Sequence, residues 1–328
     1  MQRYILRRIL FSIPVLFTVV LFSFLLIRLQ PNGPFAATPA GFPMPETLRT
    51  TLETRYGLNQ PWYQQFVQYV SNLLQGNFGP MLRSRFLDVN EVIAASLPVT
   101  LQLGFLALAL GMAIGVPAGV TAAIYHNSRV DYLATLLAVL GISIPNLVLA
   151  PLLVWLFGIE LDWLPIAFWG AEQPFFLGFL PTPSLEFWLH AILPTVTLAV
   201  VISASVARLL RASLLEVLSK DYIRTARAKG LKEQAVLFRH ALKNAFIPTL
   251  TVLGPILVTL LPGTIVVENI FALNGLGRQL VESVFDREYF LMTSSMLIFA
   301  ILLVMGNLIT DVLYAYLDPR ISYKGQSQ

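Results

Sequence analysis

Long apolar windows separated by short clusters of charged residues dominate this chain. A membrane-spanning helix needs about 20 consecutive apolar residues, because a backbone in lipid must satisfy its own hydrogen bonds. Six windows are long enough, and each predicts one span: Ile9–Ile27, Val99–Ile124, and the segments from Asp131 to Glu160, Glu186 to Arg208, Lys243 to Glu268 and Glu288 to Asp311. A seventh run, Gln173–Leu185, is too short to span, so we expect an external loop that dips into the membrane interface.

The composition agrees with this pattern. Of the 328 residues, 56% are hydrophobic and 12% are charged, and the mean hydropathy is +0.71. A soluble domain carries about 25% charged residues, so this chain cannot coat a water-facing surface of its size. Cysteine is absent, which excludes disulfides and thiolate chemistry. We predict an all-α integral membrane protein with six transmembrane helices, embedded in a lipid bilayer.

Lysine and arginine positions predict the orientation. Six spans put both termini on one side, and most of the 22 Lys and Arg residues fall in the segments that share that side. The positive-inside rule therefore makes the N- and C-termini cytoplasmic. We expect an N-terminal anchor helix at 1–28, a long external loop at 29–95, a core domain at 96–316 that includes a cytoplasmic loop at 212–245, and a cytoplasmic tail at 317–328.

The external loop contains two helical patterns. Pro45–Tyr56 predicts a short helix, and a second begins after Pro61, where proline is favourable, and ends at Gly76. Apolar and aromatic residues of the second helix recur at helical spacing, opposite glutamine and asparagine. This amphipathic helix is expected to pack on the external rim, with contact to substrate as the alternative.

The basic stretch Ser219–Pro248 is the most informative segment. Ser219 and Asp221 are favourable at a helix start, Tyr222–Lys229 predicts a short helix, and Gly230 predicts a left-handed turn with positive φ. A second helix is expected from Lys232 towards Asn244, and Pro248 is expected to begin the next span. One side of this structure is basic, through Arg224, Arg227, Lys229, Lys232 and Arg239. Proximity to anionic lipid explains the charge, but a rigid helix–glycine–helix protrusion is better suited to docking a protein.

This segment, RTARAKG followed by RHALKNAFIP, resembles the cytoplasmic coupling loop of type I ABC importer permeases. The residues RTARAKG most resemble the branch of this family that imports dipeptides, oligopeptides and nickel. Arg224 occupies the position where the wider family has glutamate. The blocks RYGLNQP, LLQGNFG, ENIFALNGLG and DVLYAYLDPRI extend the resemblance over nearly the whole chain, and MQRYILRRIL is typical of the first of two permeases.

The resemblance implies a type I ABC importer transmembrane domain. The chain would form half of a translocation pathway for di- or oligopeptides. Its partners would be a second homologous permease, two ABC ATPase subunits and an extracytoplasmic solute-binding protein, with no nucleic acid involved. The loop residues expected to couple to the ATPase are Asp221, Tyr222, Arg224, Thr225, Ala226, Arg227, Lys229, Gly230, Arg239 and His240.

The sequence contains no G-x-x-x-x-G-K-[ST] phosphate loop and no persuasive catalytic set. The chain is therefore expected not to be an enzyme and to bind neither cofactor nor metal, with ATP and Mg²⁺ held by the ATPase subunits. The spans carry almost no charge, apart from Asp311, which argues against ion coupling. Neutral polar residues are the candidate pathway positions, with helix–helix packing as the favoured alternative for each: Gln102, Asn146, Ser203, Thr259 and Ser295.

Prolines inside the windows predict kinks at several points, including Pro145. Two other functions stay open. The same type of importer could carry a nickel chelate, glutathione or another small solute, and a membrane scaffold could use the basic loop for docking alone.

Overall fold

The described part of the protein is built from helices. The computed structural model describes residues 2–29, 45–55, 59–81, 88–168 and 184–317. Within these ranges the only β-pairing is an isolated antiparallel bridge between Pro80 and Asp88. The helical elements are α1 (Gln2–Arg28), α2 (Glu46–Arg55), α3 (Trp62–Leu74), α4 (Val89–Ile124), α5 (Arg129–Ser143), α6 (Asn146–Leu153), η1 (Val154–Glu160), α7 (Leu185–Leu218), α8 (Asp221–Ala228), α9 (Glu233–Ala235), η2 (Val236–Ala241), α10 (Leu242–Ile270), α11 (Leu276–Phe285) and α12 (Tyr289–Leu317).

Four helices are long and apolar enough to cross a membrane without a break, namely α1, α4, α7 and α12. Two bent pairs of helical segments pass the same test together, so the described residues contain six spans when each pair counts as one. This confirms the prediction of an all-α membrane protein with six spans. The short run Gln173–Leu185 lies almost wholly outside the described residues.

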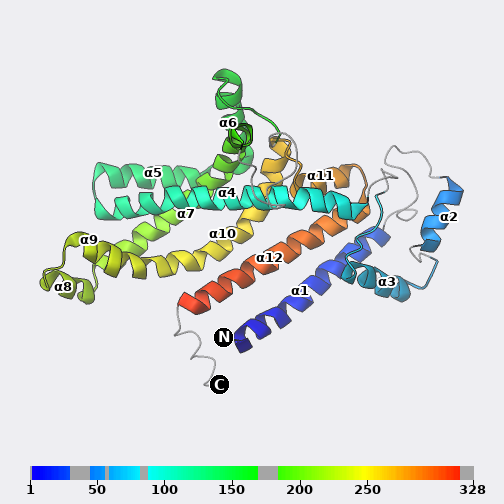
Figure 1. The fold of residues 1–328 in the computed structure, drawn as a ribbon, viewed down its shortest axis with the longest axis horizontal. Coiled ribbons are helices and arrows are strands. Elements are labelled where there is room, and N and C mark those ends of the chain that lie inside the picture. The colour runs from blue at the N-terminus through cyan, green and yellow to red at the C-terminus, as the bar shows by residue number, and fades with distance from the viewer. Residues whose placement is uncertain (1, 30–44, 56–58, 82–87, 169–183, 318–328) are drawn as a thin grey trace.

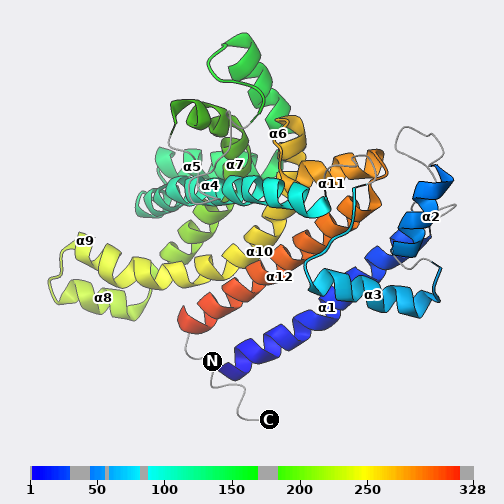
Figure 2. The same ribbon diagram turned by 45° about the vertical axis from the view of Figure 1, so that its right-hand side comes forward.

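The third predicted span is a broken helix. α5 ends at Ser143, and the segment Asn146–Glu160 continues at an angle of 105° to it. Pro145 lies at the break with extended backbone angles, which follows from its fixed φ and missing N–H. The kink expected at Pro145 is therefore present, and it is sharp enough for α6 to project sideways from the bundle (Figures 1 and 2).

The spans lie side by side along the long axis of the molecule (Figure 1). The first turn of α1, the last turn of α12 and the short helix α8 lie towards one end, whereas α2, α3 and α11 lie towards the other. Both ends of the span bundle therefore carry short helices. The first span begins, and the last span ends, towards the end that carries α8.

Glycines bring α4 and α7 close together. Gly111, Gly115 and Gly119 are four residues apart and form a stripe along α4. A Cβ on Gly115 would lie 2.6 Å from the backbone oxygen of Ser203, and one on Gly119 would lie 2.7 Å from that of Ala207. Backbones that approach this closely gain van der Waals contact where lipid offers no hydrophobic driving force. The stripe therefore fixes the central helix pair of the bundle.

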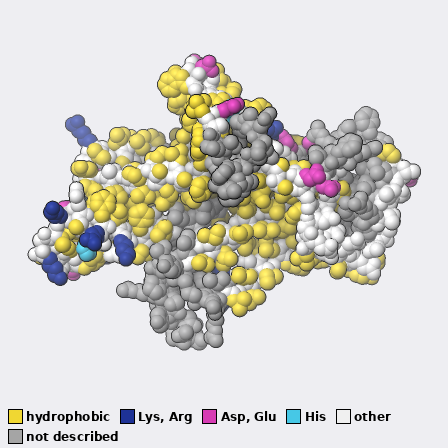
Figure 3. Space-filling view, viewed as in Figure 1, with side chains coloured by type: hydrophobic (Ala, Val, Ile, Leu, Met, Phe, Trp, Pro, Cys, Tyr) yellow, Lys and Arg dark blue, Asp and Glu magenta, His cyan; other side chains and the backbone are white. Residues whose placement is uncertain are grey.

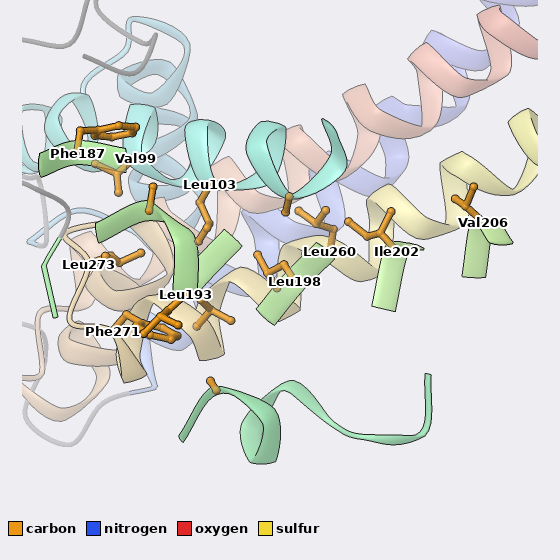
Figure 4. Packing of buried hydrophobic residues seen from close by; sticks show 14 residues of the cluster. Val99, Leu103, Phe187, Leu193, Leu198, Ile202, Val206, Leu260, Phe271 and Leu273 are labelled. Carbon is orange, nitrogen blue, oxygen red and sulfur yellow. The ribbon is translucent and has the colours of Figure 1, made fainter. Parts of the chain in front are cut away.

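The largest apolar cluster lies between α4, α7 and α10 (Figure 4). Leu103 of α4, Leu198 of α7 and Leu260 of α10 meet there, and Phe271 and Leu273 close the cluster after α10 ends. A second cluster lies where α8 packs against α4, α7 and η2, and a third joins the start of α4 to α11 and α12. The three clusters bury apolar side chains along the whole length of the bundle.

Helix α3 packs on α1. The Phe66 ring lies 5.2 Å from Phe24 and 5.9 Å from Phe17, both in edge-on geometry favourable for aromatic pairs. Gly76 follows α3 with a φ of +74°, as the capping prediction requires. The two helices expected after residue 29 are both present, and the aromatic face of the second is used for packing against the first span.

Candidate functional site

Helix α8 is anchored to the end of the bundle by two buried residues. Ile223 is fully buried and Ala226 is 7% exposed, and both pack against Leu210 and Leu214 of α7 and Val236 of η2. The helix begins at Asp221, one residue earlier than expected, and Ser219 bonds back to α7 instead of capping α8. Because its inner face is packed, α8 is held as a rigid protrusion.

Gly230 closes α8 as predicted. Its φ is +78°, its N–H donates to the Arg227 carbonyl at 2.9 Å, and the Leu231 N–H donates to the Ala226 carbonyl at 3.4 Å. This pair of bonds is the Schellman motif, which satisfies carbonyls that a helix end leaves unpaired. A Cβ at Gly230 would meet no heavy atom within 4 Å, so the turn is open to solvent on that side.

The segment after the turn differs from the expectation. The second helix does not end near Asn244, and Pro248 does not begin a new span, because α9, η2 and α10 form one helical run from Glu233 to Ile270. This run bends by 43° between Leu250 and Gly254. The exposed loop and the fifth span are therefore one mechanical element.

The outer face of the loop mixes charge with exposed apolar groups. Arg224 is 74% exposed and has only a long ion pair of 3.4 Å with Asp221. Tyr222, Leu231 and Phe238 expose between 42% and 59% of their surface. Figure 3 shows Lys and Arg side chains gathered over α8 and the adjoining end of the bundle. Exposed apolar groups rimmed by polar and charged side chains mark sites of contact with a protein or a membrane.

One exposed ion pair spans the turn on this surface. Arg227 donates to the two carboxylate oxygens of Glu233 at 2.6 and 3.1 Å, across the turn that Gly230 makes. The bidentate bond to Glu233 raises the pKa of Arg227 above its usual value. Thr225 bonds to the backbone of its own helix, and Lys229, Arg239 and His240 are exposed. Among the ten predicted coupling residues, Ala226 is the buried anchor and most others remain available to a partner.

An ion pair with a buried carboxylate lies beneath the loop, and the sequence did not predict it. Asp131 is 2% exposed and accepts two bonds from Arg211 of α7, one of them at 2.7 Å from Nη2. The Asn127 N–H also donates to Asp131 at 2.9 Å, and His126 Nδ1 lies 3.1 Å away. These contacts tie the turn between α4 and α5 to α7, which leads directly into α8.

The predicted pathway residues do not form one cluster. Asn146 lines a recess of about 50 Å³ between α6, α7 and α10, and Ser205 of α7 lines it too. Ser203 instead bonds to the Val200 carbonyl and faces the α4 glycine stripe, as expected for helix packing. Gln102 and Ser295 are buried in α4 and α12. The side chain of Thr259 lies outside the described part of the chain.

Glu268 lies at the end of the fifth span, as the apolar window predicts, because it is in the last turn of α10. Nothing in the sequence analysis predicted that this carboxylate is fully buried, with partners on α4 and α11. Among the residues that the structure describes, no group of three or more His, Asp or Glu side chains could hold a metal ion.

Up to six spans, an exposed loop with a packed inner face and a bundle held by small residues define a multi-pass helical membrane protein. The chain belongs to the family described as binding-protein-dependent transport system inner membrane component, whose model matches residues 115–323. A companion model for the N-terminal part of such membrane components matches residues 1–104. The family confirms the resemblance on which the permease interpretation rests, and the apolar helices agree with a multi-pass inner membrane protein.

Several relatives match over their full length. The chain is 41% identical over 323 residues to the oligopeptide transport system permease protein OppB of Salmonella typhimurium, covering 98% of this chain and 100% of the relative. It is 38% identical over 328 residues to the oligopeptide permease AppB of Bacillus subtilis, with the same coverage. It is 40% identical over 324 residues to the glutathione transport system permease GsiC of Escherichia coli, covering 99% and 100%.

Solved structures share the fold. The inward-facing MetNI methionine ABC transporter matches with a TM-score of 0.55 at 16% identity, covering 69% of this chain and 96% of that chain. An amino acid ABC transporter matches with a TM-score of 0.52 at 18% identity, covering 69% and 94%. These likenesses confirm the predicted type I importer fold for the greater part of the chain.

Proposed function

We propose that this chain is a permease subunit of an ATP-driven importer and forms half of the pathway by which peptides enter the cytoplasm. A second homologous permease supplies the other half. Two ABC ATPase subunits dock on the loop that includes α8, and an extracytoplasmic solute-binding protein delivers substrate at the opposite end. The chain itself hydrolyses nothing, and ATP and Mg²⁺ act on the ATPase subunits.

The observation that carries this proposal is the loop at one end of the bundle. Its inner face is packed by Ile223 and Ala226, and its outer face exposes Tyr222, Leu231 and Phe238 with nothing in the described chain to cover them. The second arm of the loop is continuous with the fifth span. A partner that moves this surface therefore moves a membrane helix, which is the lever that ATP-driven transport needs.

The same end of the molecule supports the proposed orientation. The loop, the first turn of α1 and the last turn of α12 lie towards the end where Lys and Arg gather, which supports cytoplasmic termini. The segments 1–28, 29–95, 96–316 and 317–328 then serve as anchor, external loop, core permease domain and cytoplasmic tail.

The cargo is supported by the full-length relatives, several of which are named oligopeptide permeases. The recess beside Asn146 holds about 50 Å³, room for water but not for a peptide. The peptide path is therefore expected between the two permeases. Among the residues that line the recess, Asn146 and Ser205 are the best placed to contribute polar groups to the peptide path.

Affinity purification and uptake test the proposal together. The chain is expressed with its neighbouring permease, ATPase and binding-protein genes, and the purified complex is reconstituted in liposomes. We expect ATPase subunits to co-purify and labelled peptide to accumulate only with ATP and the binding protein present. This chain alone should transport nothing. Failure to bring down an ATPase would favour a scaffold, whereas peptide uptake by the chain alone would remove the need for a second permease.

Glutathione is the second candidate cargo, because the relative GsiC is named a glutathione permease and is as similar as the oligopeptide permeases. Calorimetry on the binding protein separates the two, since that protein selects the solute. Tight binding of glutathione with no binding of unmodified tri- or tetrapeptides would replace peptides by glutathione while leaving the importer mechanism intact.

A further inference from the structure

Glu268 stands at a junction of three helices. It lies in the last turn of α10 and is fully buried. The Thr100 hydroxyl of α4 donates to one of its carboxylate oxygens at 2.7 Å, and the N–H groups of Gly277 and Arg278 donate to the other at 2.7 and 3.1 Å. The Leu276 N–H completes the set by donating to the Thr100 hydroxyl at 2.8 Å.

These bonds replace a missing helix cap. α11 is preceded by Gly275, which has no side chain to cap the first N–H groups. Thr100 and Glu268 accept from the first three of them instead, and a carboxylate at a helix start is also favoured by the helix dipole. The glycine leaves room for this arrangement, because a Cβ at Gly275 would lie 2.3 Å from the Glu268 carboxylate.

The turn between α10 and α11 is closed by the same residue. The Leu273 N–H donates to the Glu268 carbonyl at 2.9 Å, and Ala272 adopts a left-handed φ of +52°. The Arg278 guanidinium bonds to the Ala272 carbonyl at 2.7 Å. Backbone and side chain of Glu268 thus hold the turn, the start of α11 and the side of α4 as one unit.

The other end of this helical run is the loop that carries the proposed ATPase contact, because α9, η2 and α10 are continuous from Glu233. We propose that Glu268 is the positioning residue that joins α10 to α11 and α4, so that a movement imposed on the loop reaches α11 at the opposite end of the bundle. This inference rests on the proposed function, since it needs an ATPase to impose the movement.

A reporter on α11 tests the junction without knowledge of the cargo. The chain has no cysteine, so Phe285→Cys gives one labelling site on this subunit, and Phe285 is 82% exposed. The complex without this cysteine, labelled in the same way, gives the background from the other subunits. The whole complex is labelled with an environment-sensitive fluorophore and ATP–Mg is added. We expect a fluorescence change that falls roughly tenfold in Glu268→Ala, while co-purification and hydrolysis of ATP stay normal. Glu268→Gln should restore the change, since its amide oxygen can accept from Gly277 and Arg278.

Glu282→Ala is the matched control. Glu282 is also on α11 and pairs with Arg278 at 2.6 Å, but its side chain is 43% exposed. This variant should respond to ATP like the parent. Thr100→Val is the second test variant, because it keeps the side-chain shape and cuts the link to α4. The fluorescence response of Thr100→Val should be reduced. If Glu268→Ala does not accumulate in the membrane, the response of Thr100→Val tests the positioning role instead.

The outcomes separate the two proposals. A complex without bound ATPase contradicts the proposed function itself. With the ATPase bound, an unresponsive label in the parent, or full responses in Glu268→Ala and Thr100→Val, overturns the role of Glu268. Equal losses of ATP hydrolysis and label response in these variants also overturn it, because they would show a structural role only.

Discussion

Replacement of Gly230 by leucine tests whether the loop couples to a partner. Gly230 has a φ of +78°, and this left-handed conformation costs a residue with a Cβ roughly 1–2 kcal/mol. A Cβ there meets no heavy atom of the chain within 4 Å, so no internal clash adds to that cost. The intrachain penalty therefore changes the local equilibrium by a factor of roughly 5–30 and leaves the spans untouched.

Gly76 provides a matched control. Its φ is +74°, a Cβ there also meets nothing within 4 Å, and the N–H of Asn77 bonds back to the Asn72 carbonyl as Leu231 does to Ala226. The same motif therefore ends α3, towards the other end of the bundle from α8. Gly76→Leu should carry the same conformational cost without touching a surface near the proposed ATPase contact.

Membrane level, ATPase co-purification and peptide uptake are measured for both variants. We expect normal membrane levels in both, normal ATPase co-purification in Gly76→Leu, and loss of ATPase docking and uptake in Gly230→Leu. Gly230→Asn should lie between parent and leucine variant, because asparagine tolerates the left-handed region better. Equal docking and uptake in Gly230→Leu and Gly76→Leu would refute the coupling role of the loop.

Three further predictions address topology and packing. A cysteine that replaces Gly230 should react with a membrane-impermeant reagent only in inverted vesicles, and one that replaces Gln75 only in intact cells. Labelling of the first variant in intact cells would contradict the predicted orientation. Gly115→Ala should lower stability by roughly 1–3 kcal/mol in thermal unfolding, because its Cβ would lie 2.6 Å from a backbone oxygen, whereas Gly306→Ala, with open space around it, should raise stability slightly. Asp131→Asn should cost about 3 kcal/mol, because it leaves the partner guanidinium without its carboxylate; an unchanged unfolding temperature would show that the pair is not structural.

The number of spans could be predicted because the bilayer sets the length of each apolar window. The break at Pro145 was also predictable, since proline lacks an N–H and restricts the residue before it. Its angle was not, because the direction of α6 depends on contacts with α7 and α10 that are far away in sequence. Local chemistry therefore predicts where a helix breaks, and tertiary packing decides where the second half goes.

In the coupling loop, too, local chemistry was predictable from the sequence and tertiary packing was not. Gly230 is a local signal, and its positive φ and the end of α8 were both expected. Pro248 suggested a new helix, yet the helical run passes through it and bends only after Leu250. Ala241 and Ala245 are fully buried in the apolar cluster under α8. This packing keeps the segment around Pro248 helical, although proline has no N–H to donate.

Buried acids were the hardest feature to predict, because a window bounded by charge indicates where a span ends but not whether the acid at that end is buried. Glu268 lies in the last turn of α10 and is fully buried. Its partners Thr100 and Gly277 supply hydrogen bonds, and Thr100 is 168 positions away in sequence. A carboxylate is expensive to bury alone, but here it removes the cost of leaving helix-start N–H groups unpaired. Asp131 follows the same logic with Arg211 and a backbone N–H. A buried acid in such a bundle therefore marks a joint between helices, and a sequence can indicate it only where the acid and the glycines that make room for it lie together, as in ENIFALNGLG.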